Sequence, residues 1–184
     1  MTTERNPLDR TGTTTLRLDL GGTILAVDVP RNPFIMGDCV TVSKKIYDKL
    51  LGNKQFLLLR MLETPTNKYQ MTQSIVYFKD KLPSGSKCNS HVIVLYNGNI
   101  IDGLMMGLAQ QKSEDTSRWC NININTYIET LVNEHIDLST FSGKEIDFEF
   151  QDHPLDSIDS RWDTHRVNTI LTYNIDTKKL LIST

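Results

Sequence analysis

The chain has 184 residues, enough for one domain that buries about two thirds of the surface of its unfolded form. Its apolar runs are short, so we expect neither a membrane span nor a signal peptide. The net charge of −2 conceals an asymmetry: residues 1–90 carry 13 Lys/Arg against 8 Asp/Glu (+5), and residues 91–184 carry 7 against 14 (−7). Two halves of opposite net charge can attract each other between copies of the chain, unless the fold mixes these charges over its surface.

The first residues differ from the rest. Residues 1–13 lack hydrophobic periodicity and contain Pro7 and Gly12, which indicates a flexible arm before a single β-rich domain over residues 14–184. A hairpin follows, because two alternating segments flank the turn Gly21-Gly22. Its apolar residues share one face: Leu16, Leu18, Leu20, Leu25, Val27 and Val29.

A short amphipathic helix is predicted over residues 44–51, with Ser43 as its N-cap and Gly52 at its stop. Lysines gather on it and just beyond. These residues are Lys44, Lys45, Lys49 and Lys54. They form either a solvated face or a contact for phosphate or nucleic acid.

The next apolar run, Gln55 to Met61, predicts a strand that pairs with residues 69–79. Basic and aromatic residues interleave on these two predicted strands, as single-stranded nucleic-acid binding requires. Core aromatics flanked by surface lysines would give the same pattern.

The clearest turn is Asn97-Gly98, since both central residues of a type I′ turn need positive φ. It sets Tyr96 opposite Asn99, Leu95 opposite Ile100 and Val94 opposite Ile101. Apolar side chains then fall on both faces, so we expect this hairpin to be central and buried.

An uncharged segment rich in Met and Gly follows the hairpin. Such a segment forms an adaptable apolar surface for self-association or membrane contact, or else a strand end or helix start in the core. The residues of the expected contact are Gly103, Leu104, Met105, Met106, Gly107 and Leu108.

The C-terminal part predicts further elements. Residues 121–125 alternate as a strand, Thr126-x-x-Glu129 is a capping box for a helix over residues 127–135, and residues 144–150 alternate acidic with apolar side chains as an edge strand would. A closing hairpin is expected around residues 174–178. The fold class is therefore mainly β with two short helices, an antiparallel sandwich or partly open barrel.

Candidate chemistry is sparse. One polar loop is either a solvated loop or a site for a metal ion that activates water. Its candidate ligands are His153, Asp156, Asp159, Asp163 and His165. Three cysteines and four histidines are present, but no local motif selects a Cys–His pair, and the odd, widely spaced cysteines (Cys39, Cys88 and Cys120) favour a reducing compartment over a disulfide framework. We therefore expect neither a catalytic centre nor a metal or cofactor, with a metal-dependent hydrolase as the alternative.

The layout resembles that of matrix proteins of rhabdovirus-like negative-strand RNA viruses. The resemblance rests on the β-rich domain with opposed charge halves, the loose arm, the Met-Gly segment and Asn/Ile/Thr-rich stretches such as residues 121–125. It implies a self-associating, non-enzymatic virion or host-cytoplasm protein that links nucleocapsid or RNA to membrane. Residues 74–81 also resemble a strand of viral movement proteins, which implies single-stranded nucleic-acid binding instead.

Overall fold

The computed structural model describes residues 12–31, 38–64, 76–82, 85–88, 91–134, 145–152 and 167–182. Within these ranges the fold is mainly β and every strand pairing is antiparallel, which confirms the predicted fold class. The elements are β1 (Thr13–Asp19), β2 (Ile24–Pro30), α1 (Asp38–Lys49), β3 (Lys54–Thr64), β4 (Val76–Leu82), β5 (Gly85–Cys88), β6 (His91–Tyr96), β7 (Asn99–Ile101), α2 (Gly103–Gln111), the 3₁₀ turn η2 (Thr116–Trp119), β8 (Cys120–Ile122), α3 (Ile124–Glu134), β9 (Glu145–Asp152), β10 (Val167–Asn174) and β11 (Lys179–Ile182).

Seven strands form one open sheet in the order β11-β10-β9-β3-β6-β7-β8, while β1-β2 and β4-β5 form separate ribbons. The β6–β7 hairpin has the predicted register around Asn97 and Gly98, whose φ angles are 49° and 85°. The β1–β2 hairpin turns at Gly21-Gly22 and the closing β10–β11 hairpin at residues 175–178. All three hairpin predictions are confirmed, and in the first two the chemistry of the turn residues fixes the register.

Two predicted pairings are wrong. Residues 69–75 of the expected partner strand lie outside the described residues, but residues 76–79 belong to β4, which pairs with β5, whereas β3 pairs with β6 and β9. Strand β9 is not an edge strand, because it lies between β3 and β10. Its Asp147 and Glu149 are buried, and Asp147 accepts a hydrogen bond of 2.7 Å from Thr172. Partners of this kind allow a carboxylate inside a sheet.

Two helices begin earlier than predicted. Helix α1 starts at Asp38, so Ser43 lies inside the helix and not at its cap. Helix α3 starts at Ile124, because the side chain of Asn123 accepts the backbone N–H of Thr126 at 2.8 Å and ends the strand there. The earlier start of α1 brings Cys39 into its first turn.

The Met-Gly segment forms α2, a buried helix, which agrees with the alternative of a helix start in the core. Asp102 caps it, accepting the backbone N–H of Met105 at 3.0 Å. All residues from Gly103 to Ala109 are buried, and a Cβ added at Gly103 would lie 2.4 Å from Ile46 Cδ1 and 2.5 Å from Val42 Cγ1. The surface contact expected of this segment is therefore replaced by close packing between α1 and α2.

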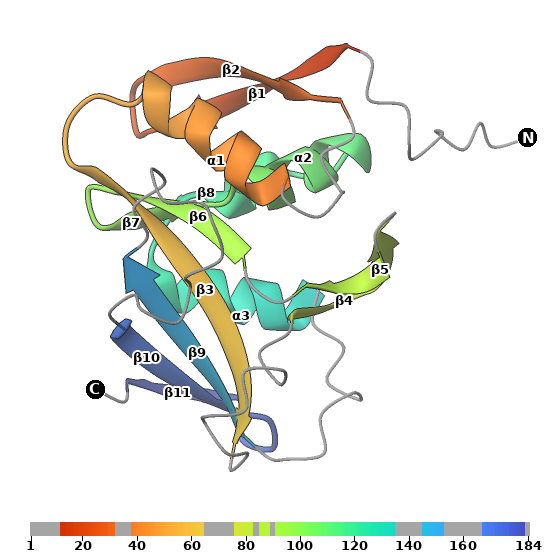
Figure 1. Ribbon diagram of the computed structural model, residues 1–184, viewed down its shortest axis with the longest axis vertical. Coiled ribbons are helices and arrows are strands. Elements are labelled where there is room, and N and C mark those ends of the chain that lie inside the picture. The colour runs from red at the N-terminus through yellow and green to blue at the C-terminus, as the bar shows by residue number, and fades with distance from the viewer. Residues whose placement is uncertain are drawn as a thin grey trace, which may run out of the picture.

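Helix α1 lies between the β1–β2 hairpin and the large sheet, with α2 beside it (Figure 1). The core includes the apolar faces of β1 and β2 together with Val42 and Ile46 of α1 and Leu50, which follows that helix directly. In the described part of the chain, no helix is long and apolar enough to cross a membrane.

Candidate active site

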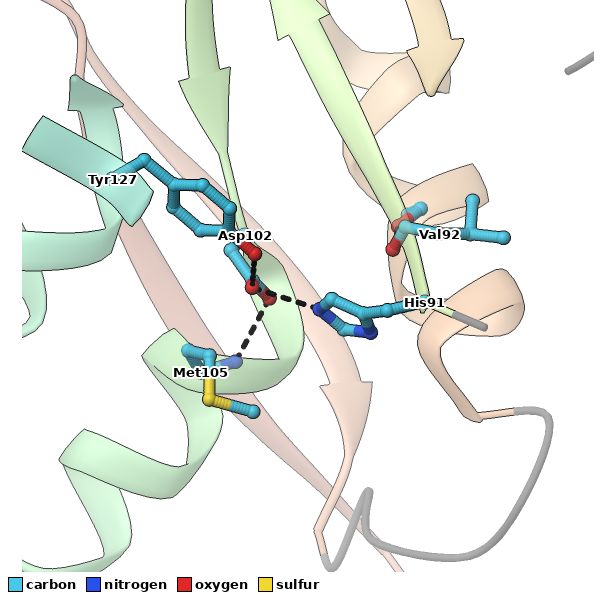
Figure 2. Close-up of polar contacts among 6 residues, drawn as sticks. His91, Val92, Asp102, Met105 and Tyr127 are labelled. Carbon is cyan, nitrogen blue, oxygen red and sulfur yellow. Dashed lines mark hydrogen bonds and ion pairs between the residues drawn. The ribbon is translucent and has the colours of Figure 1, made fainter. Parts of the chain in front are cut away.

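A buried histidine and a buried aspartate face each other at the base of the central hairpin. His91 begins β6 and Asp102 follows β7, so the antiparallel pairing brings the two residues together. His91 Nε2 lies 2.8 Å from Asp102 Oδ2, and the two residues are 1% and 0% exposed (Figure 2). The aspartate thus fixes one nitrogen of the imidazole.

Asp102 has donors on both carboxylate oxygens. The backbone N–H of Met105 donates to Oδ1 at 3.0 Å, and the hydroxyl of Tyr127 donates to Oδ2 at 2.6 Å. Burial alone would raise the pKa of Asp102, but the charge of His91 and these hydrogen bonds hold that pKa below its ordinary value of 3.8. Asp102 is therefore an anion at neutral pH.

The second nitrogen of His91 points away from Asp102 (Figure 2). Among the described residues, this Nδ1 is the buried side-chain atom that has no hydrogen-bond partner. Buried polar atoms without partners are rare in folded proteins and often mark reactive sites. Cys39 on α1 is close enough to raise the proton affinity of the His91 imidazole.

These neighbours determine the charge of His91. Burial on its own lowers the pKa of the imidazole, but the charge and hydrogen bond of Asp102, with a smaller contribution from Cys39, raise it from 6.5 to about 10. His91 is therefore a cation at neutral pH. The pair at the base of the hairpin is an ion pair with one N–H left for a third group.

The fold holds Cys39 near His91 through one buried hydrogen bond. Ser43 lies one turn after Cys39 on the same face of α1, and its Oγ donates to the carbonyl of Val92, the residue after His91, at 2.9 Å. The other end of α1 is fixed by Lys54, whose Nζ donates to the carbonyls of Tyr47 and Leu50 at 2.8 Å each.

Cys39 is a half-buried free cysteine in the first turn of α1. The first backbone N–H groups of a helix have no partner within the helix and carry its positive pole. A thiol at such a position, beside an imidazolium, matches the surroundings of reactive cysteines in general. The other described free cysteine, Cys120, is buried, and burial raises the pKa of its thiol to about 11.

The residues expected from the sequence lie elsewhere. Lys44, Lys45 and Lys49 are exposed on α1. The Nζ of Lys54 donates to the carbonyl of Tyr47 at the C-terminal end of α1 and lies 4.3 Å from the centre of the Tyr47 ring. The loop from His153 to His165 falls outside the described residues. Within the ranges that are described, no group of three or more His, Cys, Asp or Glu is arranged to hold a metal ion.

Sequence reasoning missed Cys39, His91 and Asp102 as a group. One signal was present, because extending the predicted register of the Asn97-Gly98 hairpin by one pair beyond Val94 and Ile101 sets Asp102 opposite Ile93, two residues from His91. Cys39 left no such signal, since it reaches His91 only through the packing of α1 on β6.

A hollow of about 290 Å³ lies near the C-terminal end of α1, away from Cys39. Its described lining includes Lys49 and Tyr96 but no carboxylate and no imidazole that could act as a catalytic base. No family model, no curated protein and no solved structure matches the chain.

Proposed function

We propose that the protein is a thiol-dependent hydrolase or acyltransferase, with Cys39 as nucleophile, His91 as acid and base, and Asp102 as the carboxylate that orients the imidazole. The observation that carries this proposal is the buried His91 ring, whose Nε2 is held by Asp102 and whose proton affinity is raised by both Asp102 and Cys39. A nucleophile, a base and a third group that orients the base are the parts of a nucleophilic catalytic site. Cys–His pairs with a polar third residue recur on unrelated folds.

In the proposed reaction, the thiolate of Cys39 attacks the carbonyl carbon of an ester, thioester or amide. His91 gives the Nδ1 proton to the leaving group, which departs with the electrons of the broken bond and leaves a thioester on Cys39. Water, or another nucleophile in an acyltransferase, then attacks the thioester and gives its proton to His91. The acid or transferred product leaves, and the thiolate and imidazolium are restored.

The start of α1 supplies a second element of this chemistry. The backbone N–H groups of its first turn have no acceptor within the helix, and they belong to the residues around Cys39, where an oxyanion would form during attack on a carbonyl. Loss of one such donor typically slows an enzyme by about 100-fold or more. The half-buried position of Cys39 leaves part of its side chain open to a substrate.

The test is to trap the covalent intermediate. The protein is incubated with a panel of activated esters and thioesters, and the mass of each cysteine-containing peptide is measured. We expect an acyl adduct on Cys39, turnover that is lost in Cys39→Ala, and unchanged turnover in the matched control Cys120→Ala. Turnover that is equal in wild type and Cys39→Ala would overturn the proposal.

Self-association is a second proposal, which the exposed apolar side chains of β11 favour. Leu181 and Ile182 are each 66% exposed on this edge strand of the large sheet, and edge strands pair readily with other chains. Sedimentation should show association that weakens in Leu181→Ser with Ile182→Ser. A wild-type chain that stays monomeric at high concentration would remove this proposal.

A further inference from the structure

Tyr127 is the third donor to the carboxylate of Asp102 and the one that comes from a distant helix. Its hydroxyl lies 2.6 Å from Oδ2, the same oxygen that holds His91 at 2.8 Å, and Tyr127 is fully buried. The three donors to Asp102 come from β6, from the first turn of α2 and from α3 (Figure 2).

The position of Tyr127 is itself fixed by its neighbours. Asn123 accepts the backbone N–H of Tyr127 at 2.9 Å, and the ring of Trp119 meets the phenol edge-on with 6.1 Å between ring centres. The carbonyl of Trp119 in turn accepts the backbone N–H of Asp102 at 2.8 Å. Trp119 therefore ties the phenol and the carboxylate into one rigid group.

We propose that Tyr127 is a positioning residue, which holds the Asp102 carboxylate in place and thereby sets the orientation and proton affinity of His91 toward Cys39. This inference rests on the proposed function for its meaning in catalysis, but its physical content can be tested without any substrate.

The direction of the effect follows from the charges. The titratable groups that the described structure brings against His91 are Asp102 and Cys39, and those against Asp102 are His91 and Tyr127. When His91 loses its Nδ1 proton, Asp102 remains an anion with three donors, the neutral Nε2–H of His91, the hydroxyl of Tyr127 and the backbone N–H of Met105. Without the phenol hydroxyl the anion would have one donor fewer, so the positive charge of the imidazolium would stabilise it more and the proton affinity of His91 would rise.

The experiment is a titration of the His91 ring by NMR in the full chain, from about pH 5 to about pH 11. In Tyr127→Phe we expect the midpoint to rise by about one pH unit, since a hydrogen bond to a charged group has that value. The matched control is Tyr96→Phe, which also removes a phenol hydroxyl, one that donates to the Leu51 carbonyl at 2.8 Å, and it should leave the midpoint unchanged. A midpoint in Tyr127→Phe equal to that of wild type would overturn the proposal and leave Tyr127 as a packing residue.

A second measurement on the wild-type protein covers the case in which Tyr127→Phe does not fold. The buried, hydrogen-bonded hydroxyl of Tyr127 should exchange slowly, which a deuterium isotope shift on its Cζ detects. Fast exchange would show that the hydrogen bond is absent and would also overturn the proposal. An altered titration in a protein without turnover would retain the positioning role and reject the enzymatic one, so the two failures are distinguishable.

Discussion

Ser43 Oγ on α1 donates to the backbone carbonyl of Val92 on β6 at 2.9 Å, and this buried bond sets the position of Cys39 relative to His91. Cys39 lies one helical turn before Ser43, and His91 lies one residue before Val92. One hydrogen bond therefore links the candidate nucleophile to its candidate base without involving either side chain.

The first prediction concerns this bond. Ser43→Ala should lower the free energy of unfolding by about 1–3 kcal/mol, because a buried carbonyl loses its partner. It should also slow the alkylation of Cys39, because α1 is then less firmly held against β6. Urea unfolding and thiol labelling measure the two effects. Stability and labelling that both match wild type would contradict the role given to Ser43.

The second prediction concerns Gly103. Replacing a helical glycine with alanine ordinarily stabilises a helix by about 0.5–1 kcal/mol. Here the added Cβ would lie 2.5 Å from Val42 Cγ1, on a β-branched side chain that has little freedom to move. We expect Gly103→Ala to destabilise the protein by about 1–3 kcal/mol. Urea unfolding measures the change in the free energy of unfolding. A variant more stable than wild type would show that α1 and α2 are not packed so closely at Gly103.

The third prediction is a pH dependence of stability. The pKa of His91 is raised from 6.5 to about 10, so its contribution is complete below about pH 6.5 and is lost as the pH rises to about 10. The pKa of Asp102 is lowered from 3.8, so its contribution is complete above about pH 3.8 and is lost as the pH falls. The ion pair between His91 and Asp102 therefore stabilises the fold most between about pH 3.8 and about pH 6.5.

Urea unfolding of wild type and His91→Gln across this range measures the effect. The difference in unfolding free energy between the two proteins should shrink by a few kcal/mol, in order of magnitude, between about pH 6 and about pH 10. Comparing the two proteins cancels the ionisation of lysines and of other tyrosines. A constant difference would show that His91 is not protonated in the fold.

Local chemistry explains which parts of the fold were predictable. The turns Gly21-Gly22 and Asn97-Gly98 require positive φ, so they set the registers of their hairpins from a few adjacent residues. The alternation of acidic and apolar residues in β9 wrongly predicted an edge strand. Asp147 need not face solvent, because it accepts a hydrogen bond from Thr172 on the neighbouring strand. The start of helix α2 was one of two alternatives for the Met-Gly segment, and Asp102, a favoured N-cap residue, supports it because it precedes the helix directly.

The candidate site was not predictable in the same way. Asp102 and His91 are 11 residues apart and share a hairpin, so their proximity follows from the predicted register. The approach of Cys39 depends on where α1 begins and on how it packs on β6. That packing includes Ser43, which the sequence indicated as a helix cap and which instead bonds the neighbouring strand.

The reactivity of Cys39 tests the central claim most directly. The measurement is the rate of iodoacetamide alkylation of Cys39 near about pH 7, in folded wild type, in urea-unfolded wild type and in folded His91→Gln, in a Cys88→Ser and Cys120→Ala background. The proposed activation of Cys39 by His91 predicts alkylation at least about tenfold faster in the folded wild type than in the unfolded chain, and loss of that gain in His91→Gln. A rate that is equal or slower in the folded protein, or unaffected by His91→Gln, would contradict the assignment of Cys39 and His91 as a catalytic pair.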